Sequence, residues 1–74
     1  MSRMPQVTAQ EILRFLRRQG FEDQRQRGSH LILVHPRTGR RGIVPMHRGD
    51  LGRGTAAQIL EGAGFSVDDY LRLR

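Results

Sequence analysis

The sequence contains no cysteine, and its 74 residues leave room for only one small domain. Without cysteine, the chain can form neither disulfides nor thiolate metal sites. No apolar stretch approaches the roughly 18 residues that a membrane-spanning helix needs, and the N-terminus lacks the apolar core of a secretion signal. We therefore expect one soluble, cytoplasmic domain over residues 1–74, with residues 1–6 as a flexible tail.

Lysine is also missing, because all 13 basic residues are arginine, and the formal net charge is +6. The planar guanidinium group binds phosphate through two N–H donors, so an acidic polymer is the natural partner. The lack of lysine reflects genome composition, but the net charge still requires a negatively charged partner. The charge favours nucleic acid, with an acidic protein as the alternative.

The pattern of residues 8–21 is typical of an amphipathic helix. Thr8 and Glu11 form a capping box at its start, and apolar residues recur at helical spacing after them. Gly20 suits the left-handed position that follows a helix, and Phe21 can fold back over the last turn. The arginines of this helix are expected on a solvated face, with contact to an acidic partner as the alternative.

Three extended segments follow, over residues 22–27, 30–35 and 41–44, with turns at 28–29 and 36–39. Pro45 cannot donate to a ladder and is expected to end the third strand. Residues 46–53 are predicted as a loop, and Gly54-Thr55 as the start of a second helix with Thr55 as its N-cap. Gly64-Phe65 closes this helix, and Ser66 begins a short terminal helical turn.

The central strand has apolar residues on both of its faces. His30, Ile32 and Val34 share one face, while Leu31 and Leu33 alternate with them. A layer of helices can cover only one side of a lone antiparallel sheet. We therefore expect the other side to be a binding surface for RNA, a partner protein or a second copy of the chain.

The element order predicts an α+β fold: a helix, a three-stranded antiparallel sheet and a second helix, with a terminal helical turn. The double-stranded-RNA-binding domain shares this order. An ordinary member of that class has a long first strand–strand loop and a lysine cluster at its last helix. Here the turn is only Gly28-Ser29, and the helix start offers only Arg53, which weakens a plain duplex-binding role.

Several short strings, taken in their order and spacing, resemble the HicA toxin family over roughly residues 9–71. They are Gly20-Phe21, Arg27-Gly28-Ser29-His30, Val44-Pro45-Met46-His47, Leu51 to Thr55, and Ile59-Leu60 with Ala63-Gly64-Phe65. The resemblance implies an endoribonuclease that cleaves mRNA and is silenced by a HicB-type antitoxin. We expect the chain to be a monomer when free and a hetero-oligomer with the antitoxin. The family's catalytic histidine corresponds to His30.

The chemistry of RNA cleavage supports His30 independently. RNA carries its own nucleophile, the 2′-hydroxyl beside the scissile phosphate, so an enzyme must move protons and stabilise the charged phosphorane. Histidine exchanges protons near neutral pH, and positioned acid–base catalysis contributes about 10²–10⁴-fold. Backbone N–H groups of Gly28 and Ser29 can approach the phosphate closely, because glycine permits a tight turn.

Other residues are secondary candidates. His47 is either a second proton carrier or an ordinary loop residue, and His35 is expected to be a solvated turn residue. No metal site and no cofactor are expected, since the histidines do not converge with acidic residues. The candidates for phosphate contacts are Arg27, Arg41, Arg48, Arg53 and Thr55, the last at a helix start, where N–H groups favour anions.

Two other classes of function remain open at this point. A non-catalytic RNA-binding module would bind RNA in a salt-sensitive manner and give no product. A protein-interaction domain would use the exposed sheet face to bind a partner chain and would have little affinity for RNA.

Overall fold

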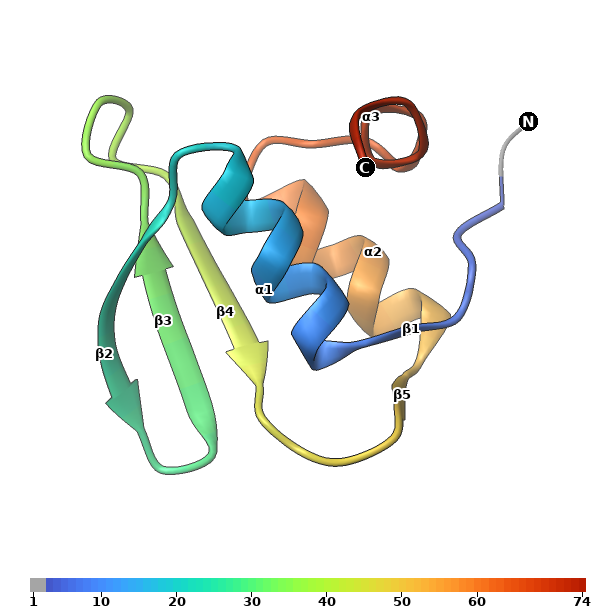
Figure 1. The fold of residues 1–74 in the computed structure, drawn as a ribbon, viewed down its shortest axis with the longest axis horizontal. Coiled ribbons are helices and arrows are strands. Elements are labelled where there is room, and N and C mark those ends of the chain that lie inside the picture. Colours follow the sequence, from blue (N-terminus) through green and yellow to red (C-terminus); the bar gives the residue numbers. More distant parts are fainter. Residues whose placement is uncertain (1–2) are drawn as a thin grey trace.

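A computed structural model describes residues 3–74 (Figure 1). The helices and strands, in chain order, are β1 (Val7–Thr8), α1 (Ala9–Arg18), β2 (Glu22–Arg27), β3 (His30–Val34), β4 (Arg41–Pro45), β5 (Asp50–Leu51), α2 (Arg53–Gly62) and α3 (Val67–Leu73).

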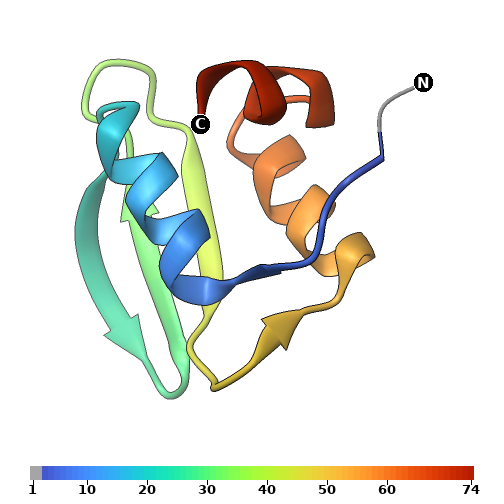
Figure 2. The same ribbon diagram turned by 45° about the vertical axis from the view of Figure 1, so that its right-hand side comes forward.

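The main sheet is antiparallel, with strand order β2-β3-β4. Helix α1 lies across one face of this sheet, and α2 runs beside β4 (Figures 1 and 2). The arrangement confirms the predicted α+β fold of the double-stranded-RNA-binding type. The strand predicted over 22–27 has the bounds expected, whereas the next two cover 30–34 and 41–45.

The two longer helices end in the same way, as the sequence predicted. Gly20 follows α1 with a φ of 98°, and Gly64 follows α2 with a φ of 96°. The N–H of Phe21 then donates to the carbonyl of Leu16 at 3.0 Å. The N–H of Phe65 likewise donates to the carbonyl of Leu60 at 2.8 Å. In both cases a left-handed glycine lets the chain turn back and satisfy an open helix carbonyl.

Two features of the loop before α2 differ from the prediction. Its residues Asp50–Leu51 form β5, which pairs antiparallel with β1; a two-residue strand paired with a distant segment has no local signal. In addition, α2 begins at Arg53 with Gly52 as its N-cap and no side-chain cap. Thr55 is therefore inside the first turn of the helix, and its prediction as the N-cap was wrong.

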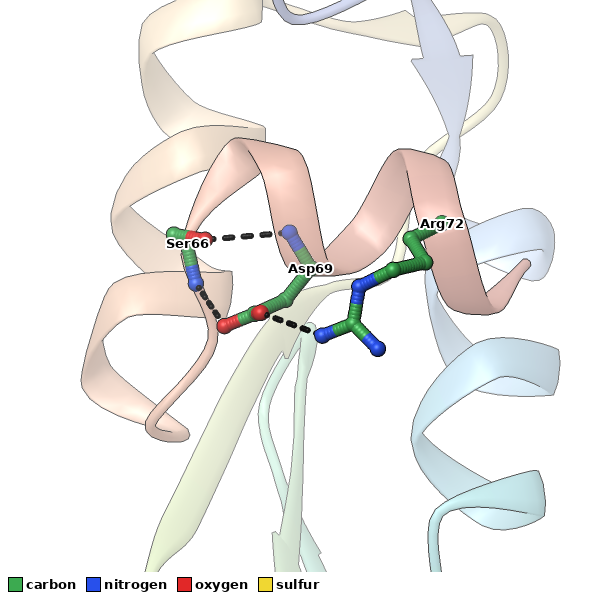
Figure 3. Close-up of polar contacts among 3 residues, drawn as sticks. All are labelled: Ser66, Asp69 and Arg72. Carbon is green, nitrogen blue, oxygen red and sulfur yellow. Dashed lines mark hydrogen bonds and ion pairs between the residues drawn. The ribbon is translucent and has the colours of Figure 1, made fainter.

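The terminal helix α3 is held at its start by a complete capping box (Figure 3). The Asp69 N–H donates to Ser66 Oγ at 3.0 Å, and the Ser66 N–H donates back to the Asp69 carboxylate at 2.9 Å. Arg72 adds an ion pair with Asp69 at 2.9 Å. The Ser66 backbone N–H, followed by the Arg72 side chain, lowers the pKa of the Asp69 carboxyl.

The core lies between the sheet, α1 and α2, and its fully buried side chains include Ile12, Leu16, Leu33 and Leu60. The flexible tail expected over residues 1–6 falls partly outside the described residues, and Met4 within it is buried in the core.

Candidate active site

The face of the sheet opposite α1 carries His30. Residues directly opposite each other on antiparallel strands share a face, and His30 pairs with Arg27 of β2 and with Pro45 of β4. Ile43 lies on the same face, opposite Ile32. Its side chain is 49% exposed, the most exposed large apolar side chain among residues 3–74. This face is therefore exposed at His30 and Ile43, whereas Ile32 beside them is buried.

The turn before His30 is a two-residue hairpin loop made of Gly28 and Ser29. Gly28 has a φ of 60°, and every residue with a positive φ in the described chain is a glycine. A left-handed glycine at the first loop position matches the twist of the flanking strands. The Ser29 carbonyl accepts a hydrogen bond from the Met46 N–H at 2.6 Å. The start of β3 is thus tied to the end of β4, which fixes the backbone on both sides of His30.

A groove of about 340 Å³ runs between β4 and α2, and His30 lines it. We call it the His30 groove. The sheet contributes His30, Arg41, Ile43 and Pro45, and α2 contributes Thr55, Gln58, Ile59 and Gly62. The groove brings together three residues that the sequence singled out, namely His30, Arg41 and Thr55.

The predicted arginines differ in their distance from His30. Arg27 is the cross-strand neighbour of His30, so their Cβ atoms are about 5 Å apart. Arg41 lines the His30 groove, but it lies four residues from Pro45 along β4, or roughly 13 Å at the rise of a strand. Arg27 is therefore the arginine beside His30, whereas Arg41 lies at the other end of β4.

A match to a family model shows which family the chain belongs to. The model for the HicA toxin of bacterial toxin–antitoxin systems matches residues 9–65, from the first residue of α1 to the residue that closes α2. The chain belongs to the HicA toxin family. It is therefore a toxin of a toxin–antitoxin system, and the family implies an antitoxin as its partner. No curated protein matches the chain.

Three of the predicted site residues of this HicA toxin, His47, Arg48 and Arg53, do not line the His30 groove. His47 and Arg48 line a second hollow, together with residues at the start of α1 such as Thr8 and Gln10. The His47 ring contacts the Arg48 carbonyl at 3.3 Å. Arg53 is exposed at the first residue of α2 and does not line the groove. The structure thus does not bring His30 and His47 into one hollow.

His35 has a structural environment that the sequence did not indicate. Its ring packs edge-on against Phe21, with 5.2 Å between the centroids and 82° between the planes. Its Nδ1 accepts a hydrogen bond from the Arg37 N–H at 3.2 Å. The residue is half-buried rather than solvated, because the left-handed Gly20 turns Phe21 back toward the end of β3.

The groove also contains residues that the sequence analysis did not select for the site. Gln58 and Gly62 come from α2, and Ile43 comes from the outer face of β4. The spacing of Thr55, Gln58, Ile59 and Gly62 places them along one side of a helix. That spacing is visible in the sequence, but it does not reveal that this side of α2 adjoins the sheet face of His30.

The described residues contain no group of three or more His, Cys, Asp or Glu side chains that could hold a metal ion. Within the same part of the chain, no helix is both long and apolar enough to cross a membrane.

Proposed function

We propose that this HicA-family toxin is an endoribonuclease that cleaves mRNA in the His30 groove by histidine acid–base catalysis, without a metal ion. The family is generally one of mRNA-cleaving toxins. The observation that carries the proposal is the exposed His30 at the groove, directly beside Arg27 on the uncovered sheet face. A proton carrier and a phosphate ligand thus adjoin a groove in a chain whose net charge is +6.

The proposed reaction uses the 2′-hydroxyl of the RNA as nucleophile. His30 removes its proton as the oxygen attacks the adjacent phosphorus, and the bond to the 5′-oxygen of the next nucleotide breaks. The products are a 2′,3′-cyclic phosphate and a 5′-hydroxyl. Arg27 and the N–H groups of Gly28 and Ser29 stabilise the charge on the phosphorane, which is the role of preorganised donors in catalysis.

The leaving 5′-oxygen needs a proton, and a water molecule or His47 supplies it. Because His47 lines the second hollow, water is the better-supported donor. If water is the donor, His47→Ala will cut RNA at nearly the native rate. If His47 is the acid, the same variant will lose about 10²–10⁴-fold in rate, the usual contribution of positioned acid–base catalysis.

The proposed partner is a HicB-type antitoxin that forms a hetero-oligomer with the toxin, which is a monomer when free. Size-exclusion chromatography with light scattering will test this assignment on the toxin alone and after mixing with a HicB-type protein encoded beside it. A single complex that no longer cuts RNA supports the partner, and separate elution of the two chains contradicts it.

The cleavage itself is tested with a labelled single-stranded RNA in excess EDTA. We expect cutting to continue in EDTA and to leave a 2′,3′-cyclic phosphate on the upstream product. A matched RNA with a single 2′-deoxy nucleotide at the cut position lacks the nucleophile and should stay intact there. Continued cutting of the deoxy RNA at that position, or complete loss of cutting in EDTA, contradicts the proposed reaction.

A further inference from the structure

The His30 groove combines a charged rim with an apolar floor. Pro45, Ile43 and Arg41 alternate along the outer face of β4, and His30 lies opposite Pro45. Ile43, in the middle of this row, is half exposed. A phosphate over Ile43 would lose water without gaining a donor, which is unfavourable for a charged group. A base suits this floor better than the sugar or the phosphate, because its flat face is the largest apolar surface of a nucleotide.

The wall of the groove formed by α2 suits the edge of a base. Gln58 is exposed there, and its carboxamide offers an acceptor and two donors side by side. This arrangement matches the donors and acceptors along the edges of nucleobases. One turn further along α2, Gly62 has no side chain, and a Cβ added there would meet nothing within 4 Å. A larger side chain at this lining residue would therefore meet no neighbouring atom of the protein.

The stacking of bases in a duplex limits which form of RNA the groove can hold. At about 340 Å³ it lies at the small end of ligand pockets, which span roughly 300–1,000 Å³. In a duplex the base faces are stacked inside, and the protein meets mainly phosphates and 2′-hydroxyls. Only an unpaired nucleotide can lay the face of its base on Ile43.

We propose that the His30 groove binds one unpaired nucleobase next to the scissile phosphate, with Ile43 and Pro45 as its floor and Gln58 at its edge. The substrate class is then single-stranded RNA, and Gln58 is a specificity-determining residue of the site. This inference rests on the proposed ribonuclease function, which it deepens. It also separates this chain from duplex binders that share its fold.

Gly62→Leu tests the proposal because it adds a large side chain at a residue that lines the groove and removes no side-chain contact. The probe is a short single-stranded RNA with 2′-fluoro sugars, which lacks the nucleophile and stays intact. Affinity is measured for the intact oligonucleotide and for a series in which one base at a time is deleted. For the native toxin, deletion at one position should weaken binding more than at the others. In Gly62→Leu the extra loss of affinity at that position should disappear. A double-mutant cycle that combines the substitution with the base deletion separates this effect from general changes in affinity.

Gly54→Leu is the matched control, because Gly54 is on the same helix and does not line the groove. A Cβ added at Gly54 also meets nothing within 4 Å, so the variant should keep the dependence on the base. If the native toxin binds the RNA but every base deletion has the same effect, or if Gly62→Leu keeps the native dependence, the groove is not a base site. The proposed ribonuclease function would survive that result.

A native toxin that neither binds nor cuts single-stranded RNA would instead overturn the ribonuclease function itself. If Gly62→Leu cuts RNA normally but is no longer neutralised by the antitoxin, the groove holds a protein segment and the base proposal fails. Gln58→Ala gives a second test. A random RNA pool is cut by the native toxin and by the variant, and the preference for each nucleotide beside the cut is measured. A preference at one position should fall by roughly 5- to 150-fold, as for loss of a good side chain–base pair. An unchanged preference contradicts the role of Gln58.

Discussion

Gly42 of β4 lies so close to Leu16 of α1 that a Cβ on the glycine would fall 2.8 Å from Leu16 Cδ1. Both residues are buried, and Leu16 has no exposed surface. The missing side chain at Gly42 lets α1 approach the inner face of the sheet, and this packing leaves the outer face, with His30, uncovered.

Gly42→Ala is therefore expected to destabilise the fold through overpacking, by about 1–3 kcal/mol. Urea unfolding followed by circular dichroism will measure the free energy of unfolding. Gly54→Ala is the control, because the added methyl group meets nothing within 4 Å and alanine is the better helix former. Equal stability of Gly42→Ala and the native protein would contradict the close packing of α1 on β4.

Arg27 and Arg18 provide a comparison between two exposed arginines on different faces. Arg27 neighbours His30, whereas Arg18 is near the end of α1 on the other side of the sheet. Arg27→Ala should lower the rate of RNA cutting by about 10²–10³-fold, the usual effect of losing one transition-state donor. Arg18→Ala removes the same charge and should have a much smaller effect. Similar losses of rate in both variants would show that cutting depends on the net charge and not on the position of Arg27 beside His30.

The lowered pKa values of two carboxyl groups predict how the free energy of unfolding depends on pH. The pKa of Asp69 is lowered by the Ser66 N–H and Arg72, and that of Asp23 by hydrogen bonds from Arg17. In the unfolded chain both carboxyl groups have the ordinary aspartate pKa of about 3.9. Below about pH 5 the unfolded chain therefore binds more protons than the folded one. These contributions are fully present above that range and are lost as pH falls through the lowered pKa values.

The measurement is urea unfolding of the native protein and Asp69→Asn between pH 7 and pH 2. The native protein should lose stability across the acid range, and the variant should show a shallower dependence there. Asp68→Asn is the control, because Asp68 is exposed in the same helix turn and is outside the capping box. The same slope in Asp69→Asn and the native protein would contradict the lowered pKa of Asp69.

Local signals in the sequence account for much of the fold. The glycines after α1 and α2, the capping residues Thr8 and Ser66, and the Gly28-Ser29 turn each act within a few residues. They therefore predicted where α1 and α2 end, where α1 and α3 begin, and the position of His30 at the start of β3. The pairing of β1 with β5 joins distant segments, and no local pattern reveals it.

The site was predictable for the same reason, but only in part. His30 and Arg27 flank a turn that the sequence shows directly. Gln58 and Gly62 belong to the groove only because α2 runs beside β4, and that placement depends on tertiary packing. His47 was considered as a second proton carrier near His30 across the sheet, but it lines a separate hollow beside the start of α1.

The central claim is that His30 carries out the cleavage, and the most direct test compares the native toxin with His30→Ala and His30→Gln. Each protein is incubated with labelled single-stranded RNA in EDTA, while RNA affinity and the melting temperature are measured on the same samples. Both variants should remain folded and bind RNA, but cut at least about 10²-fold more slowly, because neither side chain exchanges protons near neutral pH. Cutting at the native rate by folded His30→Ala would contradict the account.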